Sequence, residues 1–454
     1  MFEELERLIG RVKADYADVR YEVKRETSIG FNGRELTGLG SSSADGYVLR
    51  VLAGGGLGTV AFTSIADADK ALEAATTNAK LIGRHLDDGI RLADTDVVSD
   101  EVQPALNEDP RTIGVEEKLG LLRVYNEIAH DHPKVATTSL AHTDLVREKY
   151  FLSTEGTRIR EDLVTVRIAG IITTSEGGLT QSVRVGMGGS DGMGRLRGRE
   201  ALVEEKKKLA VDLLQAEPVK GGAHDVVLDQ RLAGVFTHEA FGHFSEADLI
   251  EDSPTMREKM QLGASLGDEI LSIKDDPTLS NQLGHYKYDD EGVRTRPVQL
   301  MKDGVLVGRL HSRRTAAAFG EPLSGHAVAE DYRYAPIIRM GAIFIEPGED
   351  TFEALIERLG DGLYLKSHMG GQTSGEDFTF GAQYGFQVKG GKIGKMVRDI
   401  NISGNLYSTL KSIRGVADDL ELGEIGGCGK GQLNVRSCYG SPHVLVEGVV
   451  IGGR

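Results

Sequence analysis

The chain has few of the residues that mark several protein classes. Its 454 residues include no tryptophan, 6% aromatic residues and only two cysteines, Cys428 and Cys438. Two cysteines cannot build the disulfide framework of a small secreted domain. We therefore expect a reducing compartment, with the cytoplasm as the default, and cysteines that are available for packing or for a metal.

Positive charge is also scarce, with 53 Lys and Arg against 69 Asp and Glu and a net charge of −16. Such a surface repels phosphate backbones and anionic membranes. No apolar run approaches the roughly 20 residues needed to cross a bilayer. The segment Met1–Ile9 also lacks the basic start and longer apolar run of a signal peptide. We expect neither nucleic acid nor a membrane as a partner.

Glycine is abundant, with 59 residues, beside 40% hydrophobic and 27% charged residues. This composition is typical of a globular protein rich in turns. The length exceeds that of one ordinary core, so we expect two domains. Pro218 and the pair Gly221-Gly222 mark the boundary, which gives an N-terminal domain at residues 1–218 and a C-terminal domain at residues 219–454.

The first half predicts an α/β domain with a β-meander and flanking helices. Apolar spacing indicates a helix within residues 1–13, short strands broken by glycine and asparagine over 16–62, and a helix over 66–81. The same order repeats from residue 115, with strands around 135–187 and a helix near 199–215.

The second half predicts a β-rich domain that carries one important helix, so the whole chain is of the α+β class. A strand over His224–Leu228 is followed by Asp229 as a helix N-cap. Asp303-Gly304 and Gly390-Gly391 indicate hairpins. The acidic run Asp289-Asp290-Glu291, just before a glycine, is interpreted as a solvated hairpin tip.

The helix after Asp229 leads into His238-Glu239-Ala240-Phe241-Gly242-His243. A zinc hydrolase needs protein ligands, an open position for water and a carboxylate that takes the proton of that water. This segment supplies two histidines and the carboxylate of Glu239. The alternative is a helix whose histidines make core hydrogen bonds and whose glutamate is exposed.

The five-residue spacing of the histidines differs from the four residues of the H-E-x-x-H helix. At about 100° per residue, five residues place two side chains roughly 140° apart on a regular helix. Both histidines reach one ion only if the helix widens into a π turn or ends between them. Gly242 makes such a distortion inexpensive, so we predict irregular backbone there.

Spacing alone leaves the third ligand open among five candidates: Glu246, Asp248, Glu251, His285 and a cysteine. Cys428 lies in a glycine-rich segment, Gly426 to Gly431, where a thiolate is a soft zinc ligand, although a small buried side chain is an equal interpretation. For Cys438 the buried interpretation is favoured.

These motifs resemble the catalytic-subunit type of the TldD/PmbA (TldD/TldE) zinc metallopeptidase family. The resemblance rests on Thr237–His243 with Glu246 and Asp248, on Gly427-Cys428-Gly429-Lys430, and on three further segments in the family's order: Tyr288–Gly292, Gly370-Gly371-Gln372 and Asp377-Phe378. It covers the second half end to end and the first half in organisation more than in motif.

The resemblance implies a zinc peptidase in which His238, His243 and Cys428 hold the metal and Glu239 activates water. It also implies an assembly of two subunits, either a homodimer or a heterodimer with a PmbA/TldE-like paralogue. An unfolded peptide would bind in extended form by strand addition. Because this chain has every metal-site residue, it would be the catalytic subunit.

Two other functions remain open, a metal-dependent amidohydrolase of a small molecule and a non-catalytic assembly subunit stabilised by zinc. The reaction also needs a group that stabilises the oxyanion. The candidates are His285, His368, Tyr384 and Arg339, which spacing does not rank.

Overall fold

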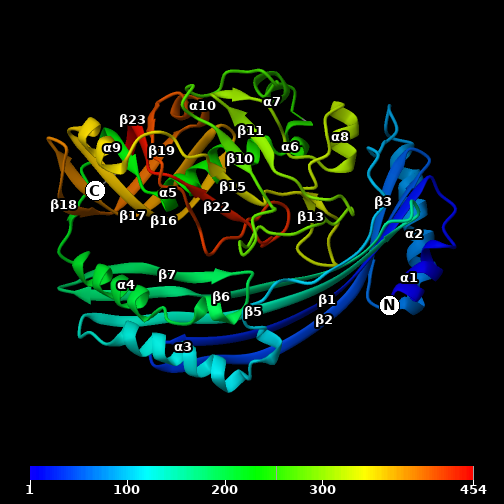
Figure 1. Ribbon diagram of the computed structural model, residues 1–454, viewed down its shortest axis with the longest axis horizontal. Helices are drawn as coiled ribbons and strands as arrows, with labels where there is room; N and C mark the ends of the chain where they lie inside the picture. Colours follow the sequence, from blue (N-terminus) through cyan, green and yellow to red (C-terminus); the bar gives the residue numbers. More distant parts are fainter. Residues whose placement is uncertain (252, 453–454) are drawn as a thin grey trace.

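The two halves of the chain form separate β-sheet layers that face each other in the computed structural model, which describes residues 1–251 and 253–452 (Figure 1). The layer from the first half is a single seven-stranded sheet. Its strands are β1 (Tyr16–Asn32), β2 (Glu35–Ala53), β3 (Gly56–Phe62), β4 (Ser99–Val102), β5 (Val135–Ser153), β6 (Arg158–Glu176) and β7 (Leu179–Gly189).

The strands of this sheet are much longer than the short meander that we predicted. β1 and β2 run for 17 and 19 residues and pass through glycines that suggested breaks. β1 is paired along its length by β2 on one side and β5 on the other. These neighbours satisfy the backbone hydrogen-bonding groups whatever the side chain, so glycine does not end the strand.

Four helices cover this sheet, and the predicted repeat of helix, strands and helix is confirmed. The helices are α1 (Phe2–Ile9), α2 (Ala68–Gly83), α3 (Val115–His130) and α4 (Glu200–Asp212). The first two pack with β1, β2 and β3 around one apolar core, and the other two pack with β5, β6 and β7 around another. In Figure 1, α3 lies on the side of the sheet away from the second half.

The second half contains two larger sheets. One has eight strands: β8 (Glu217–Pro218), β9 (Gly222–Leu228), β16 (Gly362–Ser374), β17 (Asp377–Lys389), β18 (Lys392–Arg398), β19 (Ile400–Asn405), β20 (Ile413–Val416) and β23 (Val444–Gly452). The other has six: β10 (Ile273–Asp275), β11 (Val298–Lys302), β12 (Val305–Leu306), β15 (Ala342–Ile345), β21 (Glu421–Leu422) and β22 (Cys438–Ser441). The predicted hairpins are confirmed, because β11 pairs with β12 and β17 pairs with β18.

Helix α5 (Gln230–Thr237) lies between these two sheets and contacts β16 of one and both β15 and β22 of the other. Both faces of the helix are therefore covered, and six of its eight residues are buried. The remaining elements are α6 (Ala247–Glu251), α7 (Pro254–Lys259), α8 (Arg313–Phe319), α9 (Phe352–Leu359), α10 (Leu406–Leu410) and the small pair β13 (Ala327–Val328) and β14 (Ile337–Ile338).

The acidic run Asp289-Asp290-Glu291 is not a solvated hairpin tip, so that prediction is wrong. All three residues are buried, with 2–3% of their surface exposed. Arg50 of β2 pairs with Glu291 at 2.6 Å, and Lys149 of β5 pairs with Asp290 at 3.1 Å. The run therefore joins the second half to the first, and its buried carboxylates persist because cations of the other half oppose them.

The predicted domain boundary between residues 218 and 219 stays a prediction. The chain joins the second-half sheet slightly earlier, since β8 pairs with β18. Within the described residues, no helix is long and apolar enough to cross a membrane.

Candidate metal centre

The segment that carries both histidines is a π turn, as the five-residue spacing predicted. Asp229 caps α5 by accepting the Leu232 backbone N–H at 2.9 Å, which confirms the predicted N-cap. The helix then widens into a π turn over His238–Gly242 and tightens into a 3-10 turn over His243–Ser245. Hydrogen bonds from residue i to i+5 bring residues five apart to one face. The two imidazole centroids are accordingly 5.2 Å apart.

Gly242 has a different role from the one that we predicted. Its φ of −56° and ψ of −49° are ordinary helical values, so the turn does not use the conformational freedom of glycine. A Cβ at this position would lie 2.1 Å from Met340 Sδ and 3.0 Å from Ile343 Cδ1. The absence of a side chain lets the π turn pack against β15 and the chain before it.

Cys428 reaches the histidines from a loop between β21 and β22. The loop is closed by two backbone hydrogen bonds between Cys428 and Val435, at 2.9 and 3.0 Å. The buried Arg339 guanidinium donates to the carbonyl oxygens of Cys428 and Lys430. These hydrogen bonds to the backbone hold the loop, and with it the Cys428 thiol, in place.

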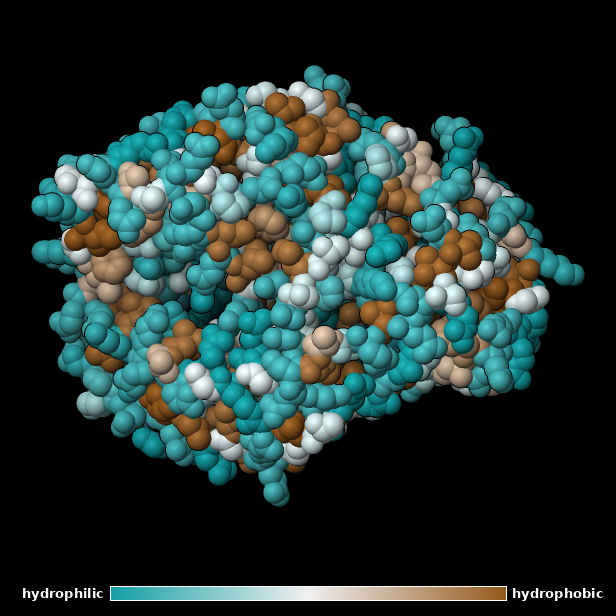
Figure 2. Space-filling model, in the orientation of Figure 1, coloured by the Kyte–Doolittle hydropathy of each residue, from teal (hydrophilic) through white to brown (hydrophobic). Residues whose placement is uncertain are grey.

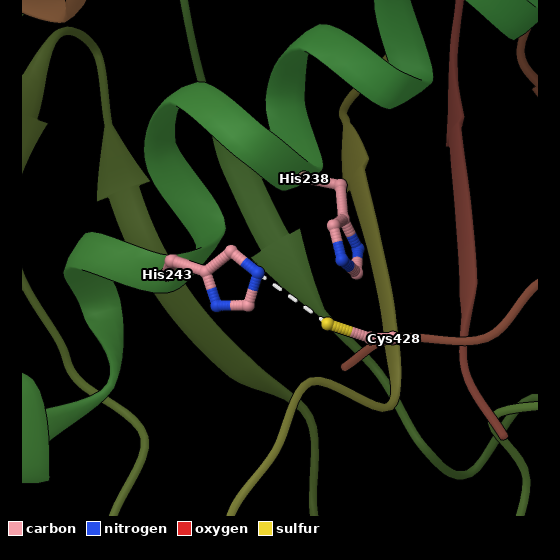
Figure 3. A group of neighbouring side chains, drawn as sticks. All are labelled: His238, His243 and Cys428. Atoms are coloured by element: carbon pink, nitrogen blue, oxygen red, sulfur yellow. Dashed lines mark hydrogen bonds between the residues drawn. The ribbon is translucent and has the colours of Figure 1, made fainter. Parts of the chain in front are cut away.

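The structure brings His238, His243 and Cys428 together (Figure 3). One ligand atom from each lies within 4.8 Å of the other two. His243 Nε2 is 3.3 Å from Cys428 Sγ. Two nitrogens from one helical segment and one sulfur from a distant loop therefore point at one small volume.

The other four candidates for the third ligand make contacts elsewhere. Glu246 lies behind His243, whose Nδ1 donates to Glu246 Oε2 at 2.9 Å. Asp248 pairs with Lys430 Nζ at 2.9 Å, and Glu251 with Arg314. His285 lies outside the cluster, where its Nδ1 donates to the Pro277 carbonyl at 3.0 Å.

The contact with Glu246 fixes the tautomer of His243. With Nδ1 protonated and bound to a carboxylate, Nε2 is left with the lone pair that a metal needs. Glu246 is fully buried, and Lys430 Nζ approaches it to 3.1 Å. The carboxylate therefore stays charged.

The electrostatics of the two imidazoles differ. Burial, with the nearby cationic groups of His243 and Arg339, lowers the pKa of His238 well below its usual value. Burial also opposes the charge of His243, but its hydrogen bonds to Cys428 and Glu246 outweigh burial and raise its pKa to about 10. A metal ion at the cluster would therefore displace the Nε2 proton of His243 and leave the Nδ1 proton donated to Glu246. The cluster thus offers a neutral imidazole and an anionic environment that attracts positive charge.

The donor set fits a zinc ion. His238 Nδ1 is buried, and no residue in the described part of the chain hydrogen-bonds to it. A buried polar nitrogen without a partner is costly unless something else occupies its lone pair. Two imidazoles and a thiolate are ligands of a kind that zinc accepts, and three protein ligands leave one position open.

Glu239 faces the same cleft as the cluster. The cleft has a volume of about 580 Å³, and its lining includes Glu239, His243 and Cys428. Thr373 of β16 donates from its hydroxyl to the Glu239 carbonyl at 2.9 Å, which holds the residue at the cleft wall. Burial raises the pKa of the Glu239 carboxyl. The carboxyl group of Glu239 therefore borders the same cleft as His243 and Cys428.

The structure separates the four candidates for oxyanion stabilisation. Arg339 supports the Cys428 loop from behind, Tyr384 packs in the apolar core of the first half, and His285 lies outside the cleft. His368 is near the cluster through Tyr439, whose hydroxyl is 3.0 Å from His368 Nε2.

Tyr439 and Thr373 were not found from the sequence. Tyr439 lies edge-on against the His238 ring, with centroids 5.4 Å apart. Both come from strands at least 130 residues after the histidines, and neither lies in a recognisable motif. Only strand pairing places them beside the π turn.

Comparisons with known proteins find metallopeptidase relatives. The family model of the PmbA/TldA metallopeptidase C-terminal domain matches residues 221–453, and that of PmbA/TldA metallopeptidase domain 1 matches residues 17–79. A metalloprotease of Synechocystis sp. is 36% identical over 454 residues, which covers 99% of this chain and 97% of that protein. A zinc metalloprotease TldD homolog of Saccharolobus solfataricus is 32% identical over 345 residues, covering 74% of this chain and 76% of that protein.

A solved structure shares the fold. TldE from Thermococcus kodakarensis superimposes with a TM-score of 0.81 at 18% identity, covering 99% of this chain and 100% of that one. At this identity the likeness concerns the fold alone. It confirms the predicted α+β class.

Proposed function

The chain belongs to the TldD/PmbA metallopeptidase family, and from this premise we propose that it is a zinc-dependent peptidase that cleaves unfolded or extended peptides. The observation that carries the proposal is the convergence of three ligand atoms within 4.8 Å at the wall of a cleft that Glu239 also lines. His238, His243 and Cys428 would hold the zinc. When bound, zinc would polarise the scissile carbonyl and lower the pKa of a bound water.

The residues of the chain divide the remaining work. Glu239 accepts a proton from the water that attacks the peptide carbonyl, and it later gives that proton to the leaving amine. Glu246 holds the Nδ1 proton of His243 and so keeps Nε2 directed at the ligand cluster. Arg339 holds the Cys428 loop through two carbonyl oxygens.

The edge of β16 supports binding of an extended peptide. Among the described residues, β9 pairs with β16 only at Leu363, Tyr364 and Leu365, whereas β17 pairs with it almost to its end. After Leu365, Asp229 accepts the Ser367 N–H and Arg184 donates to the Met369 carbonyl. The end of β16 borders the cleft, where Thr373 touches Glu239. A peptide can add to this edge through main-chain hydrogen bonds, a mode of binding that accepts many sequences.

We also propose that the protein works in the cytoplasm as one of two subunits. The partner is a second copy or a PmbA/TldE-like paralogue. Native mass measurement of the assembly, together with its metal content, decides between them.

Replacement of Glu239 tests the mechanism. Glu239→Gln keeps the size of the side chain but removes the base, so zinc content is expected to stay at the wild-type level while cleavage of an unstructured peptide falls by about 10²–10⁴-fold. Glu127→Gln is the matched control, because Glu127 is exposed on α3 of the first half. Cleavage by Glu239→Gln at the wild-type rate would exclude Glu239 as the base.

The same experiment separates the peptidase from the two other functions. The cleft of about 580 Å³ is bordered by the end of β16, to which a peptide can pair, and this favours a peptide over a small molecule. A purely structural zinc would have four protein ligands and no cleavage activity in the wild type.

A further inference from the structure

A second recess lies between the two halves of the chain, next to the metal centre. It is lined by β7 and α4 of the first half and, in the second half, by α5, β16, β17, β22 and the loop after β21. Figure 2 shows the surface hollowed on this face between the two layers. β16 borders both the recess and the metal-centre cleft, and Tyr439 of the recess lies against the ring of His238.

The lining of this recess is positively charged. Arg184 of β7, Lys206 of α4 and Arg231 of α5 all face it, and Lys206 pairs with Glu205 at 3.0 Å. Within the described residues, Glu424 is the single acidic residue of the lining. Arg199 already pairs with both oxygens of Glu424, at 2.9 and 3.1 Å. In a chain of net charge −16, three cations around one recess need a reason.

Arg184 is the cation most available to a ligand. No carboxylate among residues 1–251 and 253–452 lies within the 4.0 Å of an ion pair with it, and its Nη2 donates only to the Met369 carbonyl at 2.8 Å. Arg231 is 3.4 Å from one oxygen of Glu421, a long contact between side chains that are 35% and 50% exposed. Such a pair contributes little and can exchange for a better partner.

Two side chains separate the recess from the metal ligands. His368 lines the recess, and its Nε2 meets the Tyr439 hydroxyl at 3.0 Å. The Tyr439 ring lies in turn against the ring of His238. Burial, together with the positive charges of Arg184 and Arg231, lowers the pKa of His368 to about 4, so this imidazole is neutral at pH 7. Its Nδ1 is buried and has no hydrogen-bond partner among the described residues.

We propose that this recess is a carboxylate-binding subsite, in which Arg184 and Arg231 hold a carboxylate of the peptide substrate while the peptide bond lies at the metal centre. The inference rests on the proposed peptidase function. A guanidinium pair is the usual protein partner of a carboxylate because its N–H groups match the two oxygens. The carboxylate comes from the C-terminus of the peptide or from an acidic side chain near it.

The distances allow this arrangement. The ring of Tyr439 is 5.4 Å from that of His238 and 5.7 Å from that of His368, measured between centroids. An extended peptide advances about 3.3–3.6 Å per residue. A carboxylate beside His368 therefore lies at most about three residues from the scissile bond, and cleavage would remove a short C-terminal fragment.

The test compares three peptides of one unstructured sequence without internal acidic residues. One has a free C-terminal carboxylate, one a C-terminal amide, and one an amide with a glutamate as its last residue. Dissociation constants are measured with zinc-loaded Glu239→Gln protein, in which binding is read without cleavage. The same protein is then prepared with Arg184→Gln, or with Arg34→Gln, an exposed arginine of the first half, as the matched control.

We expect the free acid to bind about tenfold or more tightly than the plain amide, the scale of a charged hydrogen bond. Arg184→Gln should bring this ratio close to one, and Arg34→Gln should leave it unchanged. If the amide that ends in glutamate binds as tightly as the free acid, the side chain is an accepted source of the carboxylate and the subsite is supported.

Equal binding of all three peptides overturns the inference, as does a preference that survives Arg184→Gln. Cleavage by the wild type keeps the two proposals distinct. If the plain amide is cleaved in a manner that depends on Glu239 and no peptide shows an acid preference, the peptidase stands and the subsite fails.

Discussion

Substitution of Gly242 by alanine tests whether packing, rather than backbone freedom, requires glycine in the π turn. The added Cβ would lie 2.1 Å from Met340 Sδ, far inside the 3.4–4 Å of an ordinary contact. Met340 is only 2% exposed, so its side chain cannot swing into solvent. The π turn or the core around Met340 must move.

The expected cost follows from the known effect of extra methyl groups in packed cores, a loss of about 1–3 kcal/mol in the free energy of unfolding. The same displacement disturbs the approach of His243 to Cys428, now 3.3 Å between Nε2 and Sγ. Zinc affinity should therefore fall by about 10–100-fold, as when ligand-orienting contacts are lost.

Urea unfolding and zinc titration measure the two effects. Met340→Ala alone should cost about 2–5 kcal/mol, because it leaves a cavity. The double variant Gly242→Ala/Met340→Ala should lose about 1–2 kcal/mol less in free energy of unfolding than the two single variants lose together, because the new methyl group occupies part of that cavity.

Gly120→Ala is the matched control. Gly120 lies in α3 with nothing within 4 Å of its added Cβ, so this change should stabilise the protein by up to about 1 kcal/mol through helix propensity. Strict additivity of Gly242→Ala and Met340→Ala, or a Gly242→Ala protein as stable as the wild type, would refute the packing argument.

Two further predictions concern the ligand thiol and the contact between the halves. Cys428→Ser should lower zinc affinity by more than roughly 100-fold, the effect of losing a contact that only orients a ligand, because here an anionic ligand is lost. Cys438→Ser is the control and should leave zinc affinity unchanged, because burial raises the pKa of the Cys438 thiol to about 12. Equal zinc affinities of the two variants in a chelator competition would contradict the assignment of Cys428. Asp290→Asn should cost about 3–5 kcal/mol at pH 7, because Arg20 and Lys149 then lie buried beside a neutral group. Burial raises the pKa of Asp290, but Arg20 and Lys149 outweigh burial and hold it below its usual value. A depressed folded pKa contributes stability that is present above the unfolded pKa of about 3.9 and is lost as pH falls below it. The urea midpoints of the two proteins should therefore begin to converge below about pH 4, and a gap that stays constant from pH 7 to pH 3 would contradict the role of this charge.

Local sequence was enough for features that depend on neighbours in the chain. Asp229 caps α5 through a residue three positions away, and Gly390-Gly391 turns one strand back on the next. The spacing of His238 and His243 predicted a distorted helix, because helical geometry leaves no other way for both to face one ion. The structure has the π turn at that place.

Features that depend on distant partners were missed or misjudged. The acidic run Asp289–Glu291 has the composition of a solvated turn, and only the cations of β2 and β5 across the interface make its burial tolerable. The strands of the first half run through glycines because β1 has hydrogen-bonded neighbours on both sides. Such pairings are not encoded within any short window of sequence.

The same division applies to the metal centre. The sequence by itself supplied two candidate ligands and a candidate base within six residues, because their relation is set by one turn of backbone. Tertiary structure decided the rest: it brought Cys428 to His243 across 185 residues, set Glu246 behind the imidazole instead of among the ligands, and used Gly242 for packing. A backbone turn is fixed by local dihedral angles, whereas a ligand cluster depends on which distant surfaces pack together.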